Sequence, residues 1–395
     1  MQKYIEIFKN FQKWNPELIN QMKNCSHHFD SENLSPYHLE NDVWTHTVLM
    51  YKDFMEISSN ITNHDEALKD ILDCLSIIIL CHDIGKVYTR HVPNNQYGKI
   101  AFYNHSFASI QKTIDFIEYL NRFQTGFHMD SEKIHSVLNV ISNHMDFHQI
   151  INNKDDEKYG EIAAIFANYD ILKSGLTLLF NAFDKRNSID NNLNFLNKDY
   201  NDDEMMEVFK MFKDNINKEY PELNKDFDIV IYCGVPGCGK DYISELENDE
   251  NHVTLSYDDI RVDLYLESNP DDVVMKKSEL YKKAWDWCNK QNINLNDYLK
   301  KGVVGAIESG KSVGIANTNL SRKARRSLAN LLNDYKIKFV YIGCTSDKLM
   351  YRNLTRGSKN LDKMVMNKFM YNQQIPCMWE FEKCKNVVDI EFIIN

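Results

Sequence analysis

The sequence predicts a two-part chain, in which a helical N-terminal half precedes an α/β half built on a mostly parallel sheet. In residues 68–75 and 161–170, apolar residues recur three and four positions apart, which is the spacing of an amphipathic helix. From residue 226 onward, short β-branched runs alternate with helical segments, as is typical of a parallel α/β sheet. The length of 395 residues suits two or three domains at roughly 100–200 residues each.

A polar segment separates the two halves. Residues 188–204 are rich in Asn and Asp, which indicates a loop or linker. We therefore expect a helical domain over residues 1–190, a linker over 191–225 and an α/β domain over 226–395. The halves also differ in composition, because twelve of the 13 histidines precede Ile150. Histidine is the commonest metal ligand, so this crowding predicts a separate chemistry in the first half.

Composition and charge exclude several classes of protein. The formal net charge of −11 argues against a protein that coats nucleic acid with its whole surface. None of the nine cysteines forms a Cys-x-x-Cys pair, so a disulfide framework and a zinc knuckle are both poor interpretations. No apolar run approaches the ~20 residues of a membrane span, and the N-terminus does not resemble a signal peptide. We expect a cytoplasmic protein with no membrane partner.

One segment of the acidic chain is locally basic. Residues 320–363 contain eleven Lys and Arg against three acidic residues. Such an excess can hold phosphates even in a protein of negative net charge. This segment therefore leaves nucleotides and nucleic acids as possible ligands.

A first group of residues predicts a metal site. His82 and Asp83 are adjacent at the end of a buried helix and offer one nitrogen and one oxygen to an ion. His46 and Asp170, the latter expected on the inner face of its helix, could complete the set. Mixed imidazole and carboxylate ligands suit Mn, Fe, Co, Ni or Zn better than Ca or Mg.

Further residues near this set predict a second metal and a phosphate contact. His105 and His144 could complete a second site, and two neighbouring ions can activate water and clamp a phosphoryl group. Lys86 follows Asp83 by one turn and could contact a phosphate oxygen. The other histidines, including His27 and His38, are expected to be ordinary core or surface residues.

These residues resemble the HD-domain phosphohydrolases. His46, His82-Asp83 and Asp170 match the H…HD…D signature of that family in order, and the resemblance covers roughly residues 30–180. The resemblance implies an all-helical domain, with His105 and His144 where two-metal members place additional ligands. Ser106 departs from the pattern, because an acidic residue commonly follows the equivalent of His105.

A second group of residues predicts a phosphate-binding loop. The run 226–233 is typical of a buried parallel strand, and Gly234-Val235-Pro236-Gly237-Cys238-Gly239-Lys240 follows directly before a helical segment. This is G-x-x-x-x-G-K in the context that a P-loop requires. Asp241 replaces the usual Ser or Thr ligand of Mg²⁺, and its carboxylate could hold the ion directly or through water. The predicted nucleotide-binding residues are Gly234, Pro236, Gly237, Cys238, Gly239, Lys240 and Asp241.

Charged residues follow the later strands of the α/β half. Further strands are predicted over residues 252–256, 312–316, 338–342 and 387–394. Asp258 and Arg261 follow the second strand, at the carboxyl edge where open α/β sheets bind ligands. The third strand leads to Asn317-Thr318-Asn319-Leu320 and then to Arg322, Arg325 and Arg326, and the fourth leads to Arg352 and Arg356.

This half resembles the P-loop polynucleotide kinases, which phosphorylate 5′-OH ends, over residues 226–395. The resemblance implies that Asp258 is the general base on the acceptor hydroxyl and that Arg261 binds the acceptor's 3′-phosphate. It places Arg352 and Arg356 in a lid over the nucleoside triphosphate, where they stabilise the transferred phosphoryl group. The lid has one residue fewer between its arginines than the family pattern. Which of Arg322, Arg325 and Arg326 contacts a ligand is left open.

The order of the two halves resembles the bifunctional HD-domain polynucleotide kinases of bacterial and phage RNA repair. The resemblance implies that the HD domain removes a 2′,3′-cyclic or terminal phosphate with one or two transition-metal ions, Mn, Co, Ni, Fe or Zn. It implies that the kinase transfers the γ-phosphate of ATP or another NTP, with Mg²⁺, to a 5′-OH. The implied partners are RNA ends before DNA ends and a separate RNA ligase, in a bacterial or phage-infected cell.

Two other functions remain open from the sequence. The chain could hydrolyse a small nucleotide and phosphorylate a small hydroxyl compound. It could also be a nucleotide-sensing module, with Asp241 marking a weakened kinase. The basic segment 320–363 and the pair Asp258 and Arg261 favour a polynucleotide substrate.

Overall fold

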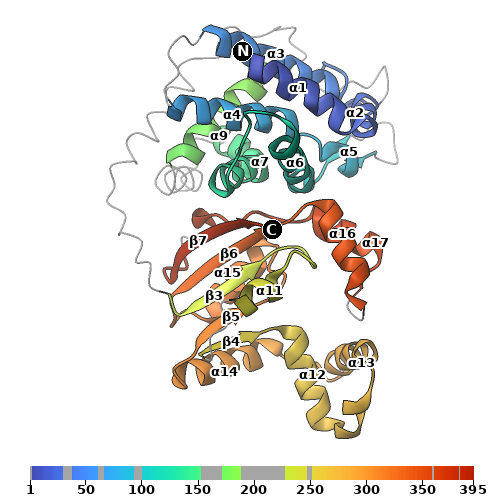
Figure 1. Ribbon diagram of the computed structural model, residues 1–395, viewed down its shortest axis with the longest axis vertical. Coiled ribbons are helices and arrows are strands. Elements are labelled where there is room, and N and C mark those ends of the chain that lie inside the picture. The colour runs from blue at the N-terminus through green and yellow to red at the C-terminus, as the bar shows by residue number, and fades with distance from the viewer. Residues whose placement is uncertain are drawn as a thin grey trace. The chain divides into compact units, whose positions relative to one another are not determined.

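The chain forms two compact units (Figure 1). The computed structural model describes residues 2–29, 38–60, 66–92, 100–152, 171–187, 227–246, 251–357, 360–381 and 383–395. One unit comprises residues 1–220 with Met370–Ile375, and the other comprises residues 221–369 with Pro376–Asn395. The predicted linker over residues 191–225 lies outside the described residues.

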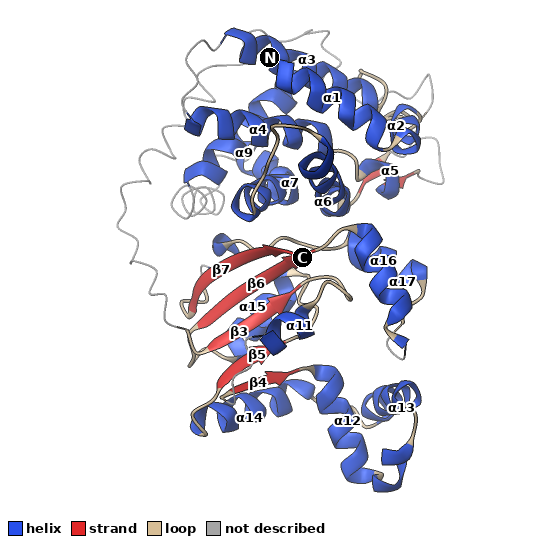
Figure 2. Cartoon of the chain, viewed as in Figure 1, coloured by secondary structure: helices blue, strands red, loops and turns tan. Residues whose placement is uncertain are grey.

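In its described residues, the first unit consists of helices and one small pair of strands (Figure 2). Its described helices are α1 (Gln2–Trp14), α2 (Pro16–Lys23), α3 (Val43–Asn60), α4 (Glu66–Cys81), α5 (Lys86–Thr89), α6 (His105–Phe123), α7 (Ser131–Asn152) and α9 (Ile171–Asn187). Between α5 and α6, β1 (Arg90–His91) pairs antiparallel with β2 (Ala101–Phe102). The expectation of a wholly helical domain is therefore wrong at this point. The Arg90 side chain donates to the carbonyls of Ser26 and His28, which anchors β1 to the body of the unit.

The central helix of this unit forms where its apolar spacing predicts it. The predicted helix 68–75 lies within α4, which continues to Cys81. Residues 77–81 at its C-terminal end are completely buried. A helix end that is apolar on all sides must be surrounded by other helices, and α4 packs against α3, α6, α7 and α9. The second predicted helix, over residues 161–170, lies outside the described residues.

Residue 85 must be glycine because α6 packs closely against it. The helix α4 ends at Cys81, and Gly85 is the N-cap residue of α5 with a φ of −61°. A Cβ at this position would overlap the backbone carbonyl of His105 at the start of α6. The Gly85 N–H donates to Oγ of Ser109 at 2.8 Å. The absence of a side chain thus lets α6 pack directly on the turn that carries His82 and Asp83.

We expect Gly85→Ala to destabilise the helical unit. An added methyl group here must move backbone, and overpacking of this kind costs about 1–3 kcal/mol. Gly175→Ala in α9 is the matched control, because nothing lies within 4 Å of its Cβ position and Gly→Ala within a helix stabilises by about 0.5–1 kcal/mol. Urea unfolding of both variants should therefore shift in opposite directions. Equal midpoints would contradict the packing interpretation.

The second unit contains a five-stranded, entirely parallel sheet with the order β4-β5-β3-β6-β7. Its strands are β3 (Ile229–Cys233), β4 (His252–Leu255), β5 (Ser312–Ile315), β6 (Ile337–Gly343) and β7 (Val387–Ile394). All five predicted strands are confirmed, with ends that differ by at most three residues. The central strand β3 is buried at every residue, which explains why its sequence is apolar without alternation.

Helices surround the sheet in this second unit. They are α11 (Lys240–Leu246), α12 (Tyr257–Ser268), η1 (Pro270–Val274), α13 (Lys277–Lys290), α14 (Leu295–Glu308), α15 (Arg322–Leu331), α16 (Ser346–Thr355), α17 (Lys363–Tyr371) and η3 (Met378–Phe381). The helix α14 packs against β4 and β5, and α12 packs against α13 and α14. Together α12, η1 and α13 form a helical lobe beyond the β4 edge (Figure 1). Across the described residues of both units, no helix has the length and apolar character needed to cross a bilayer.

Candidate active sites

Five of the six predicted metal ligands lie together in the helical unit, and all five are buried. They come from α3 (His46), the turn after α4 (His82 and Asp83), the first residue of α6 (His105) and α7 (His144). Potential ligand atoms of His46, His82 and Asp83 lie within 4.8 Å of one another, and so do those of Asp83, His105 and His144. Asp83 therefore belongs to both groups, as a carboxylate between two neighbouring ions would.

Three of these histidines are held in one orientation. His82, His105 and His144 each place Nδ1 against the backbone carbonyl three residues earlier, at 3.0, 2.9 and 2.7 Å. A neutral imidazole that donates from Nδ1 has a lone pair on Nε2. The Nε2 atoms of His105 and His144 lie 3.1 Å apart. Two lone pairs at this distance repel unless a proton or a cation lies between them.

The two carboxylate oxygens of Asp83 face the same nitrogens. Oδ1 lies 3.3 Å from Nε2 of His105, and Oδ2 lies 3.3 Å from Nε2 of His82. Burial alone would raise the pKa of Asp83, but the charges of His82 and Lys86 and the hydrogen bond from His105 hold that pKa well below its usual range. Asp83 is therefore an anion at the centre of the group.

His46 lies between two carboxylates. Its Nδ1 is 3.0 Å from Oε1 of Glu40, and its Nε2 is 2.9 Å from Oδ1 of Asp184. Burial opposes protonation of His46, but Asp184 and Glu40 raise its pKa to about 10. A carboxylate on the second nitrogen is the usual partner of a metal-binding histidine. Glu40 thus orients Nε2 of His46 toward Asp184.

Asp184 is a candidate ligand that the sequence analysis missed. Leu176, Phe180 and Asp184 are spaced four residues apart on α9, and all three are buried. This is the same signal that predicted Asp170, namely a carboxylate on the apolar face of a helix. Asp170 itself lies outside the described residues. In the described part of the helical unit, Asp184 holds the position beside His46 that the prediction gave to Asp170.

Lys86 lies beside the same group. Its Nζ is 2.7 Å from Oδ2 of Asp83 and 5.4 Å from the centre of the Phe102 ring, and the side chain is buried. A buried ammonium next to a metal group can bind a phosphate oxygen when one is present. That role remains a prediction.

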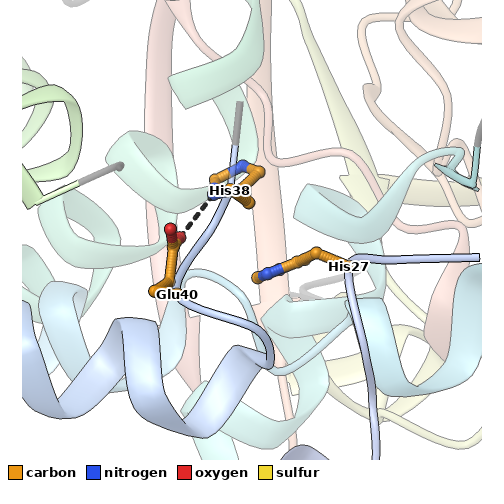
Figure 3. Close-up of side chains that lie close together, drawn as sticks. All are labelled: His27, His38 and Glu40. Carbon is orange, nitrogen blue, oxygen red and sulfur yellow. Dashed lines mark hydrogen bonds and ion pairs between the residues drawn. The ribbon is translucent and has the colours of Figure 1, made fainter. Parts of the chain in front are cut away.

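The sequence led us to expect His27 and His38 to be ordinary core or surface residues, and the structure brings their side chains together. Both lie with Glu40 in a third group of potential ligands (Figure 3). His27 and His38 are eleven positions apart, so no helical spacing in the sequence connects them.

The second candidate site is the loop between β3 and α11. Gly234, Gly237 and Gly239 have φ values of 150°, 90° and 105°, a region that other residues rarely adopt. Glycine-rich loops with such conformations are typical of phosphate-binding sites, where backbone N–H groups contact the anion. Lys240 is buried, and its Nζ donates to the carbonyl of Gly234 at 2.9 Å. Asp241 is exposed in the first turn of α11.

Arg352 reaches this loop from α16. Its Nη1 donates to the carbonyl of Cys238 at 3.2 Å, and its Nη2 donates to Oδ1 of Asn395 at 3.3 Å. Asn395 in turn donates to the carbonyl of Cys238 at 2.8 Å. The sequence contained no signal for Asn395, because no motif includes it. Arg356, the other predicted lid residue, is half-buried at the C-cap of α16.

Asp258 and Arg261 form an ion pair in the first turn of α12. Nη1 of Arg261 lies 2.8 Å from Oδ1 of Asp258, and the Arg261 guanidinium lies 4.2 Å from the centre of the Trp285 ring. The strands β4, β5 and β3 are neighbours and parallel. Their carboxyl ends therefore share one edge, which places Asp258 on the edge that carries the phosphate-binding loop. Trp285, half-exposed on α13, was missed by the sequence analysis.

Arg325 has a structural role. Its side chain is completely buried, and its guanidinium makes two bonds of 2.6 and 2.7 Å to the Glu380 carboxylate. It also donates to the carbonyls of Asn319 and Leu320 at 3.0 and 3.1 Å. Among the three arginines that the sequence left open, Arg325 therefore fixes the loop after β5 and is not available to a ligand.

Comparison with known families supports the second site. Residues 229–374 match the family model of an AAA domain, a P-loop family. A comparison with curated proteins found no match. The second unit is therefore a P-loop domain of a kind that fits a nucleotide or polynucleotide kinase, which uses an NTP with Mg²⁺.

Proposed function

We propose that the chain is a bifunctional end-healing enzyme for nucleic acid, with RNA as the preferred substrate. The helical unit is an HD phosphohydrolase that removes a 2′,3′-cyclic or terminal phosphate. The P-loop unit is a kinase that phosphorylates a 5′-OH. A single RNA cleavage that leaves a cyclic phosphate and a 5′-OH would supply both substrates, and a separate ligase would consume both products.

The observation that carries the hydrolase proposal is the pair of facing Nε2 atoms in His105 and His144, 3.1 Å apart. Their Nδ1 atoms are already committed to carbonyls, so a cation best explains this arrangement. The donor set of imidazoles and carboxylates fits Mn, Fe, Co, Ni or Zn. One ion would be held by His46, His82 and Asp83, with Asp184 beside His46 as a fourth candidate, and a second ion by Asp83, His105 and His144.

Asp83 and Lys86 can each be given a role in phosphate removal. Bound divalent ions would supply a nucleophilic hydroxide and polarise the phosphoryl oxygens. Asp83, held as an anion, would compensate for their charge. Lys86 would leave Asp83 for a substrate phosphate oxygen and balance the negative charge that develops there.

In the kinase reaction, Asp258 would accept the proton of the 5′-OH as the new bond to the γ-phosphorus forms. The bond between this phosphorus and the β–γ bridging oxygen breaks, and the nucleoside diphosphate leaves. Lys240 and Arg352, both in contact with the loop, would stabilise charge on the transferred group. Arg261, fixed between Asp258 and Trp285, would hold a phosphate of the acceptor strand.

Two surface features favour a polynucleotide over a small acceptor. Apart from the buried Arg325, the basic residues of segment 320–363 would supply more phosphate contacts than a single nucleotide needs. Trp285 offers a half-exposed aromatic surface beside Arg261, and bases stack on such surfaces with about 1–3 kcal/mol each. Both features lie in the P-loop unit that carries Asp258.

A single incubation tests the proposal. An RNA oligonucleotide with a 5′-OH and a 2′,3′-cyclic phosphate is incubated with the protein, ATP and Mg²⁺ or Mn²⁺, and mass spectrometry determines the state of both ends. We expect gain of a 5′-phosphate and loss of the 3′-end phosphate. The matched DNA oligonucleotide with a 3′-phosphate should react more slowly. If folded, metal-loaded protein changes neither end, the substrates are small nucleotides and the end-healing proposal is wrong.

A further inference from the structure

The third group of potential ligands lies on the segment between α2 and α3. Figure 3 shows the side chains of His27, His38 and Glu40 pointing toward one another. Their potential ligand atoms all lie within 4.8 Å of one another. The His27 and His38 rings stack with centroids 4.4 Å apart, and Nδ1 of His38 is 2.6 Å from Oε1 of Glu40.

We propose that His27, His38 and Glu40 bind a third divalent transition-metal ion. This site is distinct from the two ions of the proposed hydrolase centre, because it uses none of their ligands. Two imidazoles and one carboxylate are a donor set that Zn, Fe, Co, Ni and Mn favour over Ca and Mg.

Burial supports an ion at this position. His27 is 3% exposed and the Glu40 side chain is fully buried. Nδ1 of His27 is buried and has no hydrogen-bond partner among the described residues, which is costly for a polar atom unless something compensates for it. An ion would compensate for the orphaned nitrogen and for the charge of Glu40 together.

The distances also suit an ion. Ligand atoms on opposite sides of an ion at ~2.0–2.2 Å from each are at most about 4.4 Å apart. The potential ligand atoms of His27, His38 and Glu40 all lie within 4.8 Å of one another, which is close to this span. The contact between His38 and Glu40 joins two atoms that the ion would separate and bind.

The charged residues around His27, His38 and Glu40 are compatible with a bound cation. Nζ of Lys86 lies 3.4 Å from Nε2 of His27 but only 2.7 Å from Oδ2 of Asp83. Asp83 therefore neutralises Lys86, so this ammonium group does not oppose a cation beside His27. Glu40 is also 3.0 Å from Nδ1 of His46. Glu40 thus connects the third site to His46 of the proposed hydrolase centre. An ion bound to Glu40 would therefore hold His46 more firmly in position.

Metal content tests the proposal directly. Wild-type protein and a His38→Ala variant are loaded by dialysis against Zn²⁺, freed of excess metal and assayed by elemental analysis. We expect His38→Ala to hold one ion per chain fewer than wild type, and His27→Ala to show the same loss. His128→Ala is the matched control, since His128 is exposed and outside all three groups; it should keep the wild-type content.

A second variant separates this site from the proposed hydrolase centre. His105→Ala should lose its own ion, and the double variant His38→Ala/His105→Ala should lose two. If His38→Ala loses an ion and His105→Ala does not, the third site stands and the two-ion hydrolase centre fails. If folded His38→Ala, with intact helical circular dichroism, keeps the wild-type content, the third site is wrong. A variant that fails to fold is replaced by His38→Asn, to which the same two outcomes apply.

Discussion

Asp258→Ala should abolish phosphorylation of 5′-OH ends and leave phosphate removal at the 3′ end unchanged. General-base catalysis contributes about 10²–10⁴-fold, so the rate of 5′-phosphate formation should fall by that factor. The variant also frees Arg261 from its ion partner, but Trp285 still holds the guanidinium by stacking. Binding of the acceptor should therefore change less than the rate constant of transfer. Kinetics with a 5′-OH oligonucleotide and labelled ATP would measure both.

Glu267→Ala provides a matched control for this variant. Glu267 is exposed on the same helix, α12, two turns further on. Its loss removes the same charge from the same element, so a general electrostatic effect would appear in both variants. A fall in kinase activity for Glu267→Ala comparable to that for Asp258→Ala would show that Asp258 is not the base. Loss of both end reactions in Asp258→Ala would contradict separate active sites.

The architecture of the P-loop unit was predictable because buried parallel strands carry a strong local signal. The runs 229–233 and 337–343 are apolar at nearly every position, and a central strand covered on both faces permits little else. These apolar runs do not predict the order of the strands in the sheet. That order places β5 between β4 and β3, and it is what brings Asp258 to the edge of the phosphate-binding loop.

Contacts between distant segments account for what the sequence did not reveal. Trp285 reaches Arg261 from α13, and Asn395 reaches Cys238 from beyond β7. No periodic pattern in the sequence predicts either contact. Arg325 illustrates the opposite error: its position among basic residues suggests a ligand contact, whereas Glu380, 55 residues away, buries it in an ion pair. Local charge cannot distinguish these two roles.

Asp184→Asn should abolish phosphate removal and leave the kinase intact. The change keeps the shape of the side chain but removes the charge beside Nε2 of His46. Stabilisation by bound metal is worth several kcal/mol, so losing one ligand charge should slow removal of the 3′-end phosphate by at least ~10²-fold. His82→Ala, which removes a ligand candidate of the same group, should have the same effect. End-labelled RNA with a 2′,3′-cyclic phosphate would measure the rate.

Asp170→Asn is the decisive comparison, because the H…HD…D pattern assigns the final carboxylate to Asp170 and the structure places Asp184 against His46. Both substitutions remove one charge without changing side-chain volume. If Asp184 is the ligand, Asp170→Asn keeps the wild-type rate. If instead Asp170→Asn is inactive and Asp184→Asn is active, the assignment from the sequence holds, and Asp184 serves only to orient His46. Wild-type helical circular dichroism in each variant shows that the helical unit is folded, so either result identifies the ligand.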